Sequence, residues 1–142
     1  MNFIFDDLGL TAAIEWQTED FQQRTGIICT VTIEPNEISL DDNQAIALFR
    51  IFQEALTNIA RHSQAKKVVI SLTQQKETVT LKVSDDGIGI TKKSVQDSKS
   101  FGLMGIRERA SYCGGNAEIT GTPGKGTTVT VVLPIKDKET ND

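Results

Sequence analysis

The chain has 142 residues, of which 15 are lysine or arginine and 19 are aspartate or glutamate, giving a formal net charge of -4. This length is typical of one globular domain with its own core. The acidic balance argues against direct nucleic-acid binding, because neutralising phosphates needs a basic face. No apolar run approaches the ~18 residues of a membrane span and no basic, apolar leader is present, so we expect a cytoplasmic domain.

The first part of the chain predicts two helices separated by a strand. Apolar residues at helical spacing predict a helix over residues 8–24, which the glycine at position 26 ends. The β-branched segment 26–33 predicts a strand that cannot easily continue through Pro35. Asp41 and Asp42 are favourable N-cap residues, so we expect a second helix to begin after them and to run to about Ser63.

The middle of the chain predicts a hairpin followed by a loop. Segments 67–73 and 78–84 are rich in β-branched residues, and a polar stretch joins them, so they should pair antiparallel. Residues 85–102 contain glycines and polar side chains with almost nothing to bury, which predicts a mobile loop or lid.

The last part predicts a helix from Leu103 to the Gly114-Gly115 pair and strands at 116–121 and 127–134. These elements complete a domain of residues 1–136, and the charged segment 137–142 is expected to be a disordered tail. Strict alternation of strand and helix is missing, which excludes a doubly wound parallel sheet. We therefore predict an α+β two-layer sandwich, with helices on one face of a mixed, mostly antiparallel sheet.

The few cysteine and histidine residues limit the kinds of metal site that the chain could form. Cys29 and Cys113 lie in separate segments without CxxC spacing, and we interpret both as small buried thiols. The single histidine, His62, excludes a zinc site built from several histidines.

Two stripes run along the second predicted helix. Glu54, Asn58 and His62 recur at i, i+4 and i+8, about 90° around the helix from an apolar stripe. Such residues lie at the edge of the core, where they are either a solvated flank or part of a site. The apolar stripe itself predicts core and contains Leu48, Ile51, Phe52, Ala55, Leu56 and Ile59.

Three glycine motifs follow. Asp85-Asp86-Gly87-Ile88-Gly89 places carboxylates at a strand end beside glycines that permit close approach; its plainer interpretation is a tight acidic turn. The run 101–109 opens a helix with Gly102 and Gly105, where free N–H groups favour an anion such as phosphate, or where the glycines only form a hinge. The run 124–128 is either a ligand-binding turn or an ordinary hairpin loop.

The four motifs in this order resemble the catalytic ATP-binding domain of sensor histidine kinases, the Bergerat fold shared with gyrase, Hsp90 and MutL ATPases. Residues 53–62 resemble the family's N box, and 85–89, 102–105 and 124–127 resemble its glycine boxes. The resemblance spans about residues 6–135. The run 102–110 and the segment 6–10 resemble the subgroup whose response regulators carry a helix-turn-helix domain.

The resemblance implies roles for residues at both ends of a nucleotide. Asp85 would accept a hydrogen bond from the adenine amino group, and Thr127, or Thr128 beside it, would complete the base contact. Asn58 would supply an oxygen ligand to Mg²⁺, and Glu54 would orient or deprotonate the attacking imidazole. Other residues of the same motifs would contact the nucleotide or close a lid on it, namely Arg61, His62, Gly87, Gly89, Gly102, Leu103 and Gly105.

The implied activity is transfer of the ATP γ-phosphate to a histidine in two-component signalling. The partners implied are ATP, dimerisation and phosphoacceptor helices that this chain lacks, and a response regulator. Autophosphorylation is not expected here, since the only histidine belongs to the N box. Two alternatives remain: a stand-alone serine kinase that acts as an anti-sigma factor, and a degenerate nucleotide-binding module.

Overall fold

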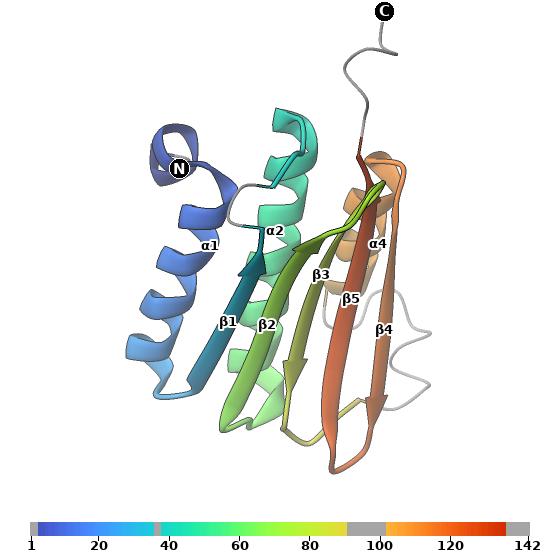
Figure 1. Ribbon diagram of the computed structural model, residues 1–142. Coiled ribbons are helices and arrows are strands. Elements are labelled where there is room, and N and C mark those ends of the chain that lie inside the picture. The colour runs from blue at the N-terminus through green and yellow to red at the C-terminus, as the bar shows by residue number, and fades with distance from the viewer. Residues whose placement is uncertain (1–2, 36–37, 91–101, 136–142) are drawn as a thin grey trace, which may run out of the picture.

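The computed structural model describes residues 3–35, 38–90 and 102–135. Five strands form one sheet in the order β1-β2-β3-β5-β4, with β1 and β2 parallel and every other pair antiparallel. The helices lie on one face of this sheet, which confirms the predicted α+β two-layer fold (Figure 1). The elements are α1 (Phe3–Thr25), β1 (Ile28–Glu34), α2 (Asp42–Asn58), the π-helical turn η1 (Ile59–Ser63), β2 (Lys67–Gln74), β3 (Thr78–Asp85), α4 (Leu103–Tyr112), β4 (Asn116–Thr122) and β5 (Gly126–Pro134).

All the elements predicted within the described residues are present, with small shifts at their ends. The first helix is longer than expected and is interrupted at Gly9, whose φ is 83°. The second helix ends in the π-helical turn η1, which apolar periodicity does not reveal. The central part of the expected lid, residues 91–101, and the expected tail lie outside the described residues.

The inner face of the sheet forms one side of the core. Alternate residues of β2, β3 and β5 are buried because successive side chains of a strand point to opposite faces. The buried set is Val68, Ile70, Leu72, Val79, Leu81, Val83, Val129, Val131 and Leu133.

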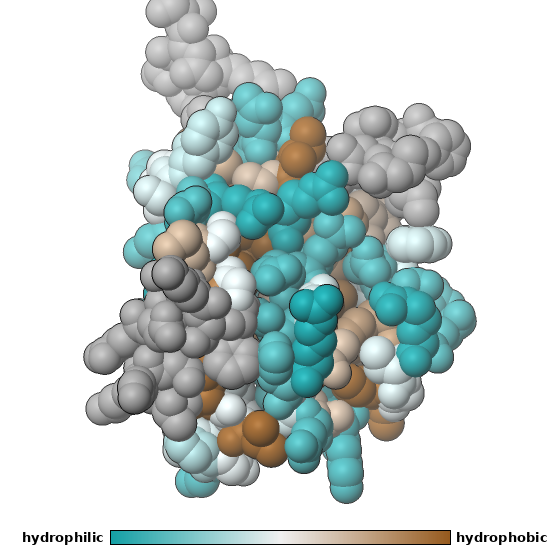
Figure 2. Space-filling view, turned by 180° about the vertical axis from the view of Figure 1, so that it is seen from behind, coloured by the Kyte–Doolittle hydropathy of each residue, from teal (hydrophilic) through white to brown (hydrophobic). Residues whose placement is uncertain are grey.

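The helices form the other side of the core through one face each. The apolar stripe predicted on α2 is buried throughout, with Leu48, Ile51 and Phe52 fully inaccessible to solvent. α1 packs through Leu10, Ala13, Ile14 and Phe21, as its spacing predicts. Seen from the helical side, the surface is largely polar, with apolar side chains in separate small groups (Figure 2). Among the described helices, none combines the length and apolar character needed to cross a bilayer.

The two cysteines differ in burial. Cys113 is buried, as expected, but Cys29 is only half-buried, so the prediction of two buried thiols was wrong for Cys29. Cys29 lies on β1, an edge strand whose residues are alternately exposed and half-buried. Burial raises the pKa of its thiol.

A buried glutamine fastens the start of α2 to the end of β5. Asp41 caps the helix by accepting from the Gln44 N–H at 2.7 Å, and the Gln44 side chain accepts from the Asp41 N–H at 3.4 Å. The Gln44 Nε2 then donates to the Pro134 carbonyl oxygen at 2.6 Å. Because Gln44 is 1% exposed, these bonds are shielded from water, and they fix one end of α2 over the sheet.

Replacing Gln44 should therefore destabilise the fold. Gln44→Ala leaves the Pro134 carbonyl without its donor and opens the capping box, so we expect a loss of about 1–3 kcal/mol in the free energy of unfolding. Urea denaturation measures this loss. The control is Asn43→Ala, which changes an exposed neighbour in the same helical turn and should cost less than about 0.5 kcal/mol. Equal effects of the two substitutions would contradict the assignment.

Candidate functional site

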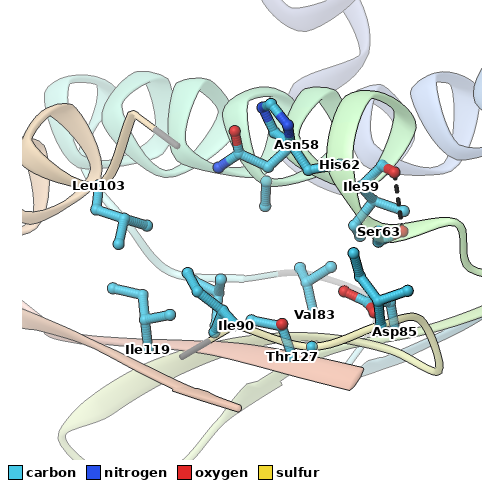
Figure 3. A pocket seen from close by; sticks show the side chains of 14 residues that line it. Asn58, Ile59, His62, Ser63, Val83, Asp85, Ile90, Leu103, Ile119 and Thr127 are labelled. Atoms are coloured by element: carbon cyan, nitrogen blue, oxygen red, sulfur yellow. Dashed lines mark hydrogen bonds between the residues drawn. The ribbon is translucent and has the colours of Figure 1, made fainter. Parts of the chain in front are cut away.

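A pocket opens between the C-terminal end of α2 and the sheet, at the end of the molecule where β3 ends and β5 begins. It encloses about 550 Å³ of space, part of it open to solvent. Asn58 and His62 reach it from the helical side and Asp85 and Thr127 from the sheet side (Figure 3). The rest of the lining is mainly apolar and consists of Ala55, Ile59, Ser63, Val83, Ile88, Gly89, Ile90, Leu103, Ile119 and Val129. Apolar walls with a few converging polar groups suit a flat aromatic ligand.

Asp85 is the one acidic side chain among the residues that line this pocket. It is the last residue of β3. Its carboxyl group accepts from the Gly87 N–H at 2.8 Å and from the Thr127 backbone N–H. Burial raises the pKa of Asp85; the two N–H donors oppose this effect, and the negative charge of Asp86 adds to it. The pocket therefore holds a carboxylate that lacks full hydration and is suited to accept a further hydrogen bond.

Asp86, next in the chain, is exposed and turned away from the pocket lining. Its Oδ1 accepts from the N–H groups of Lys66 and Lys67 at 2.8 and 3.0 Å, at the start of β2. These donors hold the pKa of Asp86 below its usual value, the Lys67 N–H contributing most. The adjacent carboxylates thus have opposite environments: one faces a pocket and one anchors backbone.

Glycine is required where the turn after β3 meets the helical layer. A Cβ atom at Gly87 would overlap the carbonyl oxygen of Ser63. The Ile88 N–H donates to that same oxygen at 2.7 Å. The turn that carries Asp85 therefore lies directly against the end of η1, and only a residue without a side chain fits between them.

The N-box residues divide between two places. Asn58 and His62 line the pocket, whereas Glu54, one turn earlier, is half-buried and does not. Glu54 lies instead against Gly102, where a Cβ atom would overlap its Oε1. Gly102 is the N-cap of α4 and has a φ of 68°, so the second glycine motif starts beside the Glu54 carboxylate.

Five other predicted site residues are not among the pocket lining, namely Gly87 and Gly102, described above, and Arg61, Thr128 and Gly105. Arg61 lies in a separate polar hollow between α1 and α2. It is the neighbour of His62 in the π-helical turn η1, where successive side chains point in different directions around the axis. Thr128 hydrogen-bonds to Ser84 at 2.7 Å and, as the neighbour of Thr127 on a strand, points to the opposite face of the sheet. Gly105 is in the first turn of α4, beyond the pocket.

Sequence reasoning missed the apolar walls of the pocket. Ile88 and Ile90 alternate with glycines in the turn after β3, and Ile88 is 50% exposed. The available sequence signal is the presence of these two large apolar residues in a glycine-rich turn, where polar residues are the usual choice. The contributions of Ile119 and Val129 carry no such signal, because both follow the ordinary alternation of a half-buried strand.

The raised pKa of Asp85 predicts the direction of a pH effect on stability. Folding raises the pKa of this carboxyl group above that of aspartate in the unfolded chain, about 3.9. Once the pH exceeds that value, ionisation of Asp85 therefore lowers the free energy of unfolding. Asp85→Asn should therefore become more stable relative to wild type as pH rises from 3.5 to 7. Urea unfolding across this range measures the difference, and a relative stability that falls with pH would contradict the assignment.

Comparisons with known proteins show the family of this chain. Residues 43–137 match the family described as histidine kinase-, DNA gyrase B-, and HSP90-like ATPase. DegS of Brevibacillus brevis, a signal transduction histidine-protein kinase/phosphatase, is 33% identical over 134 residues, covering 94% of this chain and 34% of DegS. The sensor histidine kinase LiaS of Bacillus subtilis is 38% identical over 133 residues, covering 92% of this chain and 36% of LiaS. The chain thus spans about a third of these relatives.

Solved structures show the same fold. The blue-light activated histidine kinase EL346 of Erythrobacter litoralis superposes with a TM-score of 0.74 at 21% identity, over 92% of this chain and 43% of that one. The Acinetobacter baumannii histidine kinase AdeS gives a TM-score of 0.72 at 17% identity, over 90% and 64% of the two chains. Together with the match over residues 43–137, these findings confirm the resemblance: the chain belongs to the family of histidine kinase-, DNA gyrase B- and HSP90-like ATPases.

Proposed function

We propose that this chain binds Mg·ATP in the pocket between α2 and the sheet and, together with a phosphoacceptor domain, transfers the γ-phosphate to a histidine. The observation that carries the proposal is the half-buried Asp85 carboxylate at the base of an apolar pocket, with Asn58 and His62 on the opposite wall. Two relatives that align over more than nine-tenths of this chain are named as histidine kinases, which supports the same activity.

The adenine ring fits the apolar part of the pocket. Its exocyclic amino group would donate to the Asp85 carboxylate, while the Thr127 side chain contacts the ring edge. Guanine has a carbonyl oxygen at the corresponding position, and an oxygen facing a carboxylate is repelled. The site should therefore select ATP over GTP, with Val83 and Ile88 among the side chains that contact the faces of the base.

The phosphates would lie toward Asn58, His62 and the start of α4. The Asn58 amide oxygen is a hard donor that suits Mg²⁺, which keeps waters and phosphate oxygens as its remaining ligands; the described residues hold no cluster of three or more His, Cys, Asp or Glu that would bind a metal unaided. Bound Mg²⁺ would neutralise phosphate charge. Because Gly102 caps α4 without a side chain, the first N–H groups of the helix remain available to an anion.

The chemistry is an in-line displacement at the γ-phosphorus. An imidazole nitrogen of the phosphoacceptor attacks, the bond from phosphorus to the β,γ-bridging oxygen breaks, and ADP leaves. Glu54 would accept the imidazole proton or orient the ring, and catalysis would otherwise depend on positioning and charge neutralisation. A response regulator would then receive the phosphoryl group. Arg61 lines the other hollow, so the scheme assigns it no step.

Nucleotide binding tests the site directly. Calorimetric titration should show saturable binding of Mg·ATP and none of Mg·GTP, and Asp85→Asn should weaken ATP binding about 5- to 150-fold, corresponding to about 1–3 kcal/mol for a buried partner left badly paired. Glu118→Gln, which removes an exposed charge on β4, is the matched control and should bind as wild type. Absence of ATP binding at millimolar concentration would contradict the proposed site, whereas ATP binding without phosphotransfer to a histidine would favour the degenerate module.

Phosphotransfer tests the role of Glu54. With the dimerisation domain of a relative such as LiaS supplied in trans, radiolabelled ATP should yield acid-labile phosphohistidine. Glu54→Ala should slow this labelling about 10²- to 10⁴-fold, the usual contribution of a general base, while changing ATP affinity by less than about threefold. Equal loss of rate and affinity would refute the role, and acid-stable phosphoserine on a partner would support the serine-kinase alternative.

A further inference from the structure

The turn that follows β3 is fastened to the connection between η1 and β2 by backbone contacts. The Asp86 N–H donates to the Lys67 carbonyl at 3.3 Å. The Oδ1 of the Asp86 side chain accepts from the N–H groups of Lys66 and Lys67. The Ile88 N–H donates to the Ser63 carbonyl at 2.7 Å. Four hydrogen bonds thus join two short segments, and the Asp86 side chain accepts two of them.

The position of the Asp85 carboxylate depends on this attachment. The Asp85 carboxylate accepts from two backbone N–H groups. One belongs to Gly87, inside the same turn, and donates to Oδ1; the other belongs to Thr127 on β5. No ion pair of Asp85 with a basic side chain is found in the described part of the chain. A turn that detached from the start of β2 would move Gly87, and the Asp85 carboxylate would lose its alignment.

We propose that Asp86 is a positioning residue for nucleotide recognition: its carboxylate holds the turn against the start of β2 and thereby aims Asp85 at the adenine ring. This inference rests on the proposed function. Asp86 itself does not line the pocket, so it acts only through its neighbour. The N–H donors lower the pKa of Asp86, the direction expected when hydrogen bonds favour the ionised carboxylate.

A double-mutant cycle separates positioning from general stabilisation. Calorimetry of the whole chain would measure Mg·ATP and Mg·ADP affinity for wild type, Asp86→Ala, Asp85→Asn and the double variant. Asp86→Ala should weaken both nucleotides by about tenfold, since both carry adenine. In the Asp85→Asn background the same substitution should cost less than about threefold, because the carboxylate that Asp86 aims is already gone.

Conservative variants provide the controls. Asp86→Asn keeps an acceptor oxygen at the same place and should bind ATP within about threefold of wild type, whereas Asp86→Glu keeps the charge but displaces the acceptor and should bind as weakly as Asp86→Ala. Asp86→Glu also serves if Asp86→Ala does not fold. Glu118→Ala corrects for the loss of one negative charge on an exposed strand residue.

The outcomes are distinct. The proposal is supported if Asp86→Ala lowers the affinity for both ATP and ADP only when Asp85 is intact, and if Asp86→Asn retains wild-type affinity. Equal loss in both backgrounds, or no loss in Asp86→Ala and Asp86→Glu, overturns it while leaving the ATP site intact. Failure of the wild-type chain to bind Mg·ATP would instead defeat the proposed function, and this inference with it.

Discussion

The close contact between Gly87 and the carbonyl oxygen of Ser63 sets the geometry on which the pocket depends. It brings the end of the helical layer against the turn that leaves β3, with no side chain between them. The base of the pocket is therefore backbone packed on backbone, which is more rigid than a contact between flexible side chains. Ser63 at the end of η1 and Asp85 at the end of β3 both line the pocket beside this contact.

The same arrangement explains how one acidic pair performs two tasks. Asp85 faces the pocket, where burial disfavours its charge, and Asp86 faces N–H donors that favour it. A carboxylate kept partly dehydrated is costly to the folded state but strongly disposed to accept a ligand's N–H group, because that bond restores what was lost with water. Perturbed carboxyl pKa values of this kind are common at functional sites.

Local patterns were sufficient to predict the fold. The period of 3.6 on α2 and the period of two on β2, β3 and β5 reflect burial on one side of each element, and Asp41 marks the start of α2 as a capping residue must. The Asp85 motif alone also fits a tight acidic turn, and only its order with the other three motifs indicates a nucleotide site. These signals arise from neighbours in sequence, which is why sequence alone reveals them.

Long-range geometry is what the sequence does not reveal. Arg61 and Thr128 are adjacent in sequence to His62 and Thr127, but neither is among the residues that line the pocket, because neighbours on a helix or strand point in different directions. The apolar lining from β4 and β5 and the contact of Glu54 with Gly102 depend on elements far apart in the chain. Cys29 is less buried than its strand predicted, because no sequence signal placed β1 at the edge of the sheet.

The most direct test of the account is an amide chemical-shift titration of ¹⁵N-labelled protein with Mg·ATP. The account predicts that the largest shifts occur at Gly87, Ile88 and Thr127, around the pocket between η1 and the sheet, and that residues of the hollow around Arg24 and Arg61 change little. Largest shifts in that hollow, with the amides around Asp85 unchanged, would contradict the central claim that the nucleotide binds against the glycine turn.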